Sequence, residues 1–358
     1  MQLNRNVEYA RRFCHDFINS TRPKYILGTN DYAVSVSELI DIDGYINDFT
    51  QDCSFNGKPI VSMSEVPETA LVLMAVVYRP KSALQRVKHF KFDSLDYFSF
   101  VKNSSLNIKD IEYWKGFNHE LKAHQEYYSW LRTRLADEES KDCLDRLIAF
   151  RTTYDIQHME PFDCREAQQY FEPFLNLNKQ DEIFVDVGGY DGQTTFEFIK
   201  QCPDYKTVHY FEPARDNMEE SQRRLTGVRD IVFHPEALSR RSGHSTFVAD
   251  GSSSRLAEPT PSDVTIETAR LDDIIEKPVS FIKMDIEGHE LSALEGAELQ
   301  IRKHAPRLAI CVYHRAQDLR EIPELVLSYY PYYSLYLRHY MEGFTESVMY
   351  FIPPPKQH

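Results

Sequence analysis

Short apolar runs separated by longer, mixed stretches recur through the second half of the chain. This alternation is typical of buried strands joined by helices. The predicted strands cover residues 183–187, 208–211, 231–233, 279–284, 308–313, 335–337 and 348–352. The last two are joined by a short segment containing Gly343, which leaves no room for a crossover helix, so they should pair antiparallel. The pattern predicts an α/β doubly wound sheet of five parallel strands closed by a C-terminal antiparallel hairpin.

A similar alternation occupies the first hundred residues. Strands are predicted at 25–27, 44–48 and 58–61, and the strongly apolar run 70–77 indicates a central strand buried on both faces. The stretch that follows is helical, and rich in aromatic and charged residues. We therefore expect a small Rossmann-like α/β domain (1–103), a helical connector (104–178) and a larger α/β domain (179–358).

The charge and apolar content of the chain limit which kinds of molecule it is expected to bind. The 358 residues contain 41 Lys and Arg against 55 Asp and Glu, a formal net charge of −14, which disfavours nucleic acid and anionic membranes. The longest apolar stretch, 70–78, is too short to cross a bilayer, and the first residues lack the pattern of a signal peptide. The six cysteines are scattered, without a CxxC pair. We expect a cytoplasmic protein without integral membrane association, and homo-oligomerisation stays open.

A glycine-rich motif follows the first strand of the larger domain and opens a helix. It reads D-x-G-x-x-x-G rather than the GxGxxG of dinucleotide sites. Two carboxylates here would repel a pyrophosphate but suit the sulfonium and ammonium groups of S-adenosylmethionine. A glycine-rich turn without a ligand is the alternative. The predicted cofactor-binding residues of this motif are Asp186, Gly188, Gly189, Tyr190, Asp191, Gly192 and Thr194.

Two later strand ends extend this prediction. Glu212 ends the second strand, 20 residues after Gly192, where an acidic side chain can accept hydrogen bonds from ribose hydroxyls. Glu236 and Ala237 follow the third strand, where an adenine ring would lie. A solvated carboxylate at a strand end is the alternative for Glu212.

The larger domain resembles the FkbM family of S-adenosylmethionine-dependent methyltransferases over roughly half the chain. The matching motifs are VDVGGYDGQTT at 185–195, FEP at 211–213, LDD at 271–273, IKMDIEGHE at 282–290 and LEGA at 294–297. The resemblance implies a class I methyltransferase fold and O-methylation of sugars or natural products. This chain has Gly189-Tyr190 where the family often has Ala-Asn. It has Tyr313-His314-Arg315 in place of a Glu-x-His, which keeps the histidine without the acidic partner.

The chemistry of methyl transfer points to the ends of the fourth and fifth strands. Asp285 and His314 should meet at one edge, because parallel strands deliver their carboxyl ends together. We expect His314 to be the general base, with a neutral imidazole, and Asp285 to orient the acceptor hydroxyl or the cofactor ammonium. A histidine bonded for packing is the alternative. Lys283 should share a face with Asp285, either in catalysis or in an ion pair that shapes the pocket. Asp285, helped by Glu287 or Glu290, is also a candidate Mg²⁺ ligand, although no metal site is assigned.

Acceptor contacts are expected from polar residues near the same edge. Ser253 and Arg255 lie in a long insertion between the third and fourth strands, either a mobile lid or a flexible hairpin tip. Arg338 is suited to a phosphorylated glycan, since a guanidinium can donate two parallel hydrogen bonds. The predicted substrate-binding residues are Ser253, Arg255, Glu287, Arg315, Arg338 and His339.

The sequence as a whole predicts an S-adenosylmethionine-dependent O-methyltransferase that acts on a sugar hydroxyl of a glycan precursor or glycosylated metabolite. One alternative is an NAD-dependent oxidoreductase or epimerase that uses the first domain. There, however, Asn30 and Ala33 replace the second and third glycines of the dinucleotide motif, and a scaffold role is favoured. A non-catalytic partner in glycan assembly is the other alternative.

Overall fold

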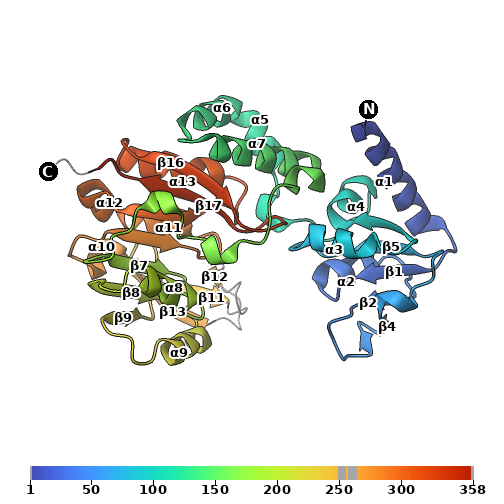
Figure 1. Cartoon of the computed structure of the whole chain (residues 1–358), viewed down its shortest axis with the longest axis horizontal. Helices are drawn as coiled ribbons and strands as arrows, with labels where there is room; N and C mark the ends of the chain where they lie inside the picture. Colours follow the sequence, from blue (N-terminus) through green and yellow to red (C-terminus); the bar gives the residue numbers. More distant parts are fainter. Residues whose placement is uncertain (1, 249–254, 257–263, 356–358) are drawn as a thin grey trace. The chain divides into compact units, whose positions relative to one another are not determined.

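The computed structural model describes residues 2–248, 255–256 and 264–355, with side chains left undescribed at 2–6, 247–248, 255–256 and 264. The chain divides into two compact units (Figure 1). Unit 1 contains residues 1–118, 145–164 and 340–345, and unit 2 contains residues 119–144, 165–339 and 346–358. The stretch 104–178 therefore contributes to both units, and the three-domain division stays a prediction. Among the described residues, no helix has the length and apolar character needed to cross a membrane.

Unit 1 is built on a six-stranded sheet in the order β3-β4-β2-β1-β5-β6. All neighbours pair parallel except β3 and β4. The strands are β1 (Lys24–Leu27), β2 (Gly44–Ile46), β3 (Ser54–Phe55), β4 (Lys58–Val61), β5 (Leu71–Met74) and β6 (Asp93–Asp96). Every residue of β5 is buried, as expected for the centre of a parallel sheet. The predicted Rossmann-like sheet is confirmed, although its strands β3 and β6 were not predicted.

Helices cover this sheet. They are α1 (Gln2–Asn19), α2 (Asp31–Ser37), α3 (Pro80–Val87) and α4 (Tyr97–Asn103). Three further helices follow, of which α7 runs from unit 2 into unit 1: α5 (Phe117–Ala123), α6 (Gln125–Arg134) and α7 (Glu138–Thr153). The side chain of Asn30 accepts a hydrogen bond from the backbone N–H of Ala33 and so caps α2.

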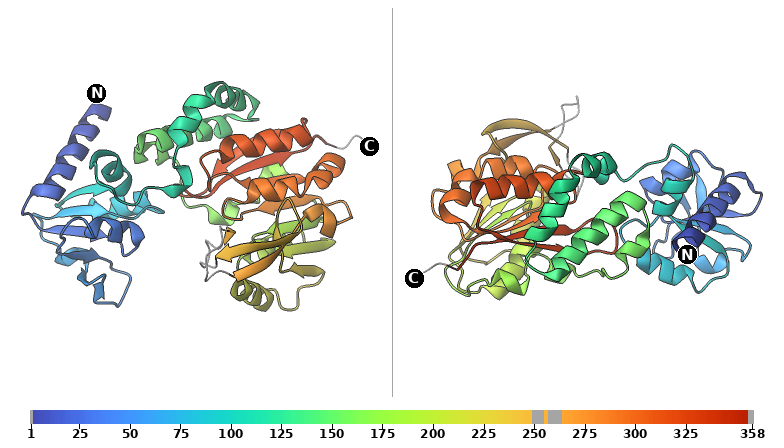
Figure 2. Two further views of the ribbon diagram at one scale, coloured as in Figure 1. Left: turned by 180° about the vertical axis from the view of Figure 1, so that it is seen from behind. Right: turned by 90° about the horizontal axis from the view of Figure 1, so that it is seen from above.

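Unit 2 contains a seven-stranded sheet in the order β16-β17-β15-β14-β7-β8-β9. The strands are β7 (Ile183–Val187), β8 (Thr207–Phe211), β9 (Ile231–His234), β14 (Phe281–Met284), β15 (Arg307–Cys311), β16 (Ser334–His339) and β17 (Ser347–Ile352). β7, β8, β9, β14 and β15 run parallel, and β17 pairs antiparallel with both β15 and β16. Figure 2 shows the red β16–β17 hairpin at one side of this sheet. The predicted five parallel strands and antiparallel hairpin are confirmed.

Further helices of unit 2 lie between its strands along the chain. They are α8 (Gln193–Gln201), α9 (Arg215–Arg224), α10 (Leu271–Ile274), α11 (Glu290–Glu295), α12 (Glu298–His304) and α13 (Asp318–Tyr329). α13 packs against both α11 and α12. The carboxyl ends of β7, β8, β14 and β15 meet at one edge of the sheet, where ligands bind in open α/β folds.

The long insertion after β9 forms a second, four-stranded sheet, which the sequence pattern did not predict. Its order is β10-β13-β11-β12, with strands β10 (Ala237–Leu238), β11 (Gly243–Val248), β12 (Arg255–Leu256) and β13 (Val264–Ala269). β11 and β13 pair antiparallel along most of their length. The strands are short and polar, as in the run TIET within β13, so alternation gives only a weak signal.

Candidate active site

The loop after β7 needs glycines because two other parts of the sheet approach its backbone. Gly188 has φ +73°, and a Cβ there would lie 1.9 Å from the carbonyl oxygen of Asp285. A Cβ at Gly189 would lie 2.1 Å from the ring of Tyr210. Gly192, also at positive φ, precedes the first turn of α8. The loop is therefore pressed between the ends of β14 and β8, and only glycine fits at these contacts.

Asp186 and Lys283 form an ion pair beneath this loop. The two residues are register partners on β7 and β14, and the Lys283 Nζ lies 3.2 Å from Asp186 Oδ1. Both side chains are almost fully buried, and Thr195 donates a hydrogen bond to Asp186 Oδ2. Lys283 Nζ also donates to the carbonyl oxygen of Gly188 at 2.6 Å. These contacts favour the interpretation that Lys283 shapes the pocket, while its catalytic role stays a prediction.

Glu212 links the end of β8 to the glycine loop. Its carboxylate accepts hydrogen bonds from the backbone N–H groups of Tyr190 (3.0 Å) and Ala214 (2.8 Å). The residue is only 5% exposed. Burial raises the pKa of Glu212, and the two N–H donors act in the opposite direction. An acidic acceptor therefore lies directly beside the loop, in the position that the motif spacing predicts.

The other predicted cofactor residues surround the same strand ends. Tyr190 is half-exposed at positive φ, and Asp191 accepts an ion-pair hydrogen bond from Arg224 at 2.6 Å. Thr194 lies partly exposed on α8, where its neighbour Thr195 is the residue that contacts Asp186. Glu236 is partly buried after β9, and its Oε2 has no hydrogen-bond partner among the described residues. Ala237 is buried in β10. Their roles in cofactor binding stay predictions.

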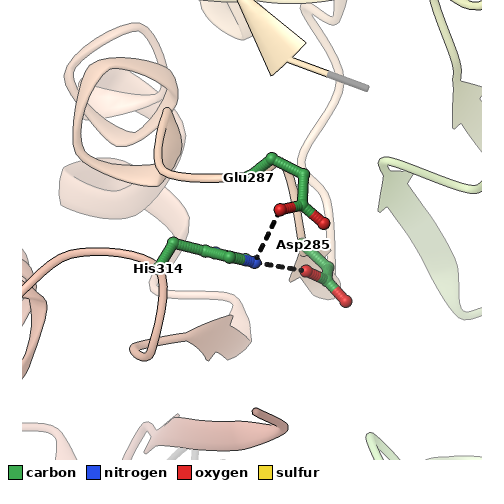
Figure 3. Close-up of side chains that lie close together, drawn as sticks. All are labelled: Asp285, Glu287 and His314. Carbon is green, nitrogen blue, oxygen red and sulfur yellow. Dashed lines mark ion pairs between the residues drawn. The ribbon is translucent and has the colours of Figure 1, made fainter. Parts of the chain in front are cut away.

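Asp285, Glu287 and His314 meet at the ends of β14 and β15 (Figure 3). His314 Nε2 lies 3.4 Å from Asp285 Oδ1 and 3.6 Å from Glu287 Oε2. Glu287 has φ +54°, a conformation that is strained for a side chain of this kind, and its carboxyl group points toward the imidazole. We call these three residues the strand-end cluster. The meeting of Asp285 and His314 at one edge is as the sequence predicts.

Glu290 holds the opposite side of the His314 ring. Its Oε1 lies 2.9 Å from His314 Nδ1 and accepts a hydrogen bond from the backbone N–H of Ile286. Burial acts to lower the pKa of His314, but the carboxylates of Glu290, Asp285 and Glu287 outweigh it and raise the pKa to about 10. The imidazole is then protonated near neutral pH. This differs from the neutral base that we expected from the reference pKa.

Two tyrosines orient Asp285. The Tyr170 hydroxyl donates a hydrogen bond to Asp285 Oδ2 at 2.8 Å, and the Tyr313 hydroxyl lies 3.4 Å from Oδ1. Burial acts to raise the pKa of Asp285, but the charges of His314 and Lys283 lower it below its ordinary value. Asp285 is therefore a carboxylate held in a defined direction, which is what either an acceptor hydroxyl or a cofactor ammonium requires.

The predicted acceptor residues are dispersed. Ser253 lies outside the described residues, and of Arg255 only the backbone in β12 is described. The Arg315 guanidinium is 3.2 Å from Glu321. Arg338 and His339 end β16, and both are buried.

The contacts of these last two residues explain their burial. The Arg338 guanidinium binds Asp137 at 2.6 Å and the Ser140 hydroxyl at 2.7 Å, while His339 Nδ1 lies 2.8 Å from the Ser347 hydroxyl. These contacts attach β16 to the start of α7 and to β17. The acceptor role that was predicted for Arg338 and His339 stays a prediction, and this geometry does not favour it.

Sequence reasoning missed three residues of this site. Tyr170, Thr195 and Tyr313 contact Asp285 or Asp186, yet none was assigned a role. Glu290 was considered only as a helper to a metal ligand, and its contact with His314 was not predicted. Thr195 lies within the glycine-rich motif, so its position there was an available signal. Tyr170 is 115 residues from Asp285, in a stretch without regular periodicity, and nothing in the pattern marks it.

Comparison with known proteins gives a family for this region. Residues 186–334 match the family model described as a methyltransferase FkbM domain. The hexuronic acid methyltransferase AglP of Haloferax volcanii is 25% identical over 193 residues, which cover 49% of this chain and 76% of that protein. These matches confirm the resemblance and the methyltransferase class that the motifs predict.

A solved structure extends the likeness to nearly the whole chain. The methyltransferase FkbM from Methylobacillus flagellatus covers 96% of this chain and 93% of its own, with a TM-score of 0.78 and 24% identity. At this identity the likeness concerns the fold, and it includes both units.

Proposed function

We propose that the chain, whose residues 186–334 match the methyltransferase FkbM family model, transfers the methyl group of S-adenosylmethionine to a sugar hydroxyl. One observation carries the cofactor assignment. The buried carboxylate of Glu212 is bonded to the backbone of the glycine loop through the Tyr190 N–H. A carboxylate that is fixed beside this loop is suited to the two ribose hydroxyls of the cofactor.

Glu236 supports the same cofactor pocket. Its Oε2 is buried without a hydrogen-bond partner among the described residues, and a buried carboxylate oxygen in this state is costly. A donor from the adenosine part of the cofactor would satisfy it. Glu212 and Glu236 follow neighbouring strands, so both can contact one extended ligand along the sheet edge.

The strand-end cluster provides the acceptor side of the reaction. Methyl transfer requires in-line positioning of the hydroxyl and removal of its proton. Asp285 and Glu287 offer carboxylate oxygens to orient a hydroxyl, and one of these carboxylates accepts its proton, because the imidazole of His314 is already protonated. The AglP match supports a sugar acceptor, because that protein is a hexuronic acid methyltransferase.

The structure of unit 1 does not favour the alternative of an NAD-dependent oxidoreductase. In a dinucleotide site the pyrophosphate binds the free N–H groups at the start of the helix after the first strand. Here the Asn30 side chain accepts from the Ala33 N–H, and its amide donates to the Ala75 carbonyl. The position of the pyrophosphate is thus taken by the protein's own side chain, which supports a scaffold role.

Calorimetry with S-adenosylhomocysteine tests the cofactor assignment. We expect one binding site, and we expect Glu212→Gln to weaken binding by roughly tenfold or more, because it removes a charged acceptor for the ribose hydroxyls. Glu197→Gln is the matched control, since Glu197 forms only exposed contacts on α8. Absence of binding heat in the native chain would refute the proposal.

Formation of S-adenosylhomocysteine, measured with a panel of candidate acceptors, tests the acceptor assignment. The panel contains glucuronic and galacturonic acid glycosides, each paired with the matching neutral hexoside. Product with any member supports a sugar hydroxyl as acceptor. Product with none, while the cofactor binds normally, would refute the acceptor assignment and leave the cofactor assignment standing.

A further inference from the structure

The strand-end cluster has the composition and spacing of a metal site. We propose that Asp285, Glu287 and His314 bind a divalent cation of the first transition row, with Mn²⁺ as the probe, and that the cation displaces the proton of His314 Nε2. The three residues each present one ligand atom, and all three atoms lie within 4.8 Å of one another. They come from two neighbouring strand ends, so the sheet itself sets their separation.

The distances fit coordination better than direct hydrogen bonding. An ion about 2.1 Å from each ligand atom holds neighbouring ligand atoms roughly 3.0–3.4 Å apart in octahedral or tetrahedral geometry. The observed separations from His314 Nε2 are 3.4 Å to Asp285 and 3.6 Å to Glu287. Both exceed the usual 2.7–2.9 Å of a charge-assisted hydrogen bond, and both are within a few tenths of an ångström of the spacing expected around such an ion.

The contacts behind the ligands are those of a metal centre. Metal-binding histidines usually donate their second ring N–H to a carboxylate, which fixes the tautomer and the direction of the ring. Glu290 provides that carboxylate at 2.9 Å from Nδ1, and its side chain is 1% exposed. The Tyr170 hydroxyl likewise directs Asp285 through Oδ2 and leaves Oδ1 facing the cluster. His314 Nε2 and Asp285 Oδ1 are thus aimed at one point by groups behind them.

The ligand types indicate the class of ion. One imidazole nitrogen with two carboxylate oxygens suits a transition ion better than Mg²⁺ or Ca²⁺, which favour oxygen alone. The carboxylates of Asp285, Glu287 and Glu290 surround a single imidazole, and a dication would balance this negative charge. Three protein ligands leave coordination positions for water or a ligand, as in catalytic rather than structural sites.

The inferred ion gives the acceptor side a specific chemistry. An open position would bind an acceptor hydroxyl and lower its pKa, and the proton would pass to a carboxylate of the cluster or to solvent as the methyl group is transferred. A second open position can hold a neighbouring oxygen of the same sugar. This role rests on the proposed function, whereas binding of the ion depends only on the cluster.

Electron paramagnetic resonance of added Mn²⁺ tests the site on the full chain. We expect one Mn²⁺ per chain in the native protein. Asp285→Asn and Glu287→Gln should each weaken binding by about 100-fold, since each removes a charged ligand. Glu290→Gln keeps a hydrogen-bond acceptor behind His314 and should weaken binding by about 10- to 100-fold. Glu295→Gln on α11 is the matched control and should bind Mn²⁺ as the native chain does.

Thermal unfolding of each variant separates loss of the site from loss of the fold. Glu287→Gln is the most informative variant. The Glu287 side chain is partly exposed and Gln has nearly the same size, so this substitution should not disturb the packing. Absence of a one-to-one Mn²⁺ signal, or equal binding by the folded Asp285→Asn, Glu287→Gln and native chains, would overturn the proposal. Binding of S-adenosylhomocysteine without Mn²⁺ binding would overturn it and leave the proposed function intact. Binding of Mn²⁺ without binding of S-adenosylhomocysteine would refute the proposed function and leave the metal site standing.

Discussion

Lys283 and Asp186 are register partners on adjacent parallel strands, and their side chains form a buried ion pair at 3.2 Å under the glycine loop. Burial acts to lower the pKa of Lys283, but Asp186 and Asp285 outweigh it, so the pKa is raised and the amine stays charged. The same amine donates to the Gly188 carbonyl. One cation therefore fixes both the end of β7 and the backbone of the proposed cofactor loop.

Replacing Lys283 by Met should destabilise unit 2 by about 3–5 kcal/mol, because it leaves Asp186 buried without its partner charge. Urea unfolding measures the change. Lys200→Met is the matched control: it breaks an exposed pair with Glu197 at 2.9 Å and should cost less than about 1 kcal/mol. Equal costs for the two variants would contradict the structural role of the pair.

Any side chain at position 188 should reduce stability for two reasons: the positive φ, and a clash of its Cβ with the backbone of Asp285. Gly188 and Gly227 have similar φ values, +73° and +80°, but a Cβ at Gly227 would meet no atom within 4 Å. Gly188→Ala should therefore destabilise unit 2 by at least about 2 kcal/mol more than Gly227→Ala. Urea unfolding of both variants checks this, and equal losses would show that the contact with Asp285 can relax.

The pair between Arg338 and Asp137 predicts an acid-sensitive contribution to stability. Partial burial acts to raise the pKa of Asp137, but hydrogen bonds from Arg338 and Ser140 outweigh it and lower the pKa to about 2. A carboxyl with a depressed pKa in the folded state stabilises the fold above its unfolded pKa, near 4. That contribution is lost as the pH falls from about 4 toward 2.

Arg338→Met tests this contribution. We expect a loss of about 1–3 kcal/mol at pH 7, and a difference from the native chain that shrinks below pH 4. Urea unfolding between pH 2 and pH 7 measures both. Binding of S-adenosylhomocysteine at pH 7 should be unchanged if Arg338 only anchors β16. A difference that does not vary with pH would contradict the assigned pair.

Asp96 at the start of α4 predicts the opposite pH dependence in unit 1. Its carboxylate caps the helix by accepting from the Ser99 N–H, but burial raises its pKa to about 6. A carboxyl with a raised pKa in the folded state disfavours folding when it ionises. Stability should therefore fall as the pH rises from about 4 to 6, by about 3 kcal/mol in total, and then level off.

Asp96→Asn isolates this effect, because asparagine also caps helices but does not ionise. Relative to the native chain, the variant should gain stability steadily between pH 4 and 6 and keep the gain at pH 8. Calorimetric unfolding across this range measures the difference. A constant difference across the range would show that Asp96 is solvated in the folded protein.

Much of the fold could be predicted because its signals are local. Apolar runs and the spacing between them predicted the parallel strands of both sheets except β6, whose sequence DSLD has no apolar run, and the short connection through Gly343 predicted the antiparallel hairpin. The meeting of Asp285 and His314 followed from strand order, since parallel neighbours end at the same edge. The four-stranded sheet after β9 was missed, because its strands are short and carry little apolar alternation.

The sequence by itself determined where most strands lie along the chain, the glycine loop, and the residue types that reach the sheet edge. Only the tertiary structure decided how those residues are paired. In the fold, Asp186 contacts Lys283, Glu290 contacts His314, and Asp137 contacts Arg338. The physical reason is that periodicity and spacing act through the local backbone, whereas charge pairing depends on atoms brought together from distant segments. Whether an ionisable side chain serves a ligand or holds the scaffold is settled by those neighbours.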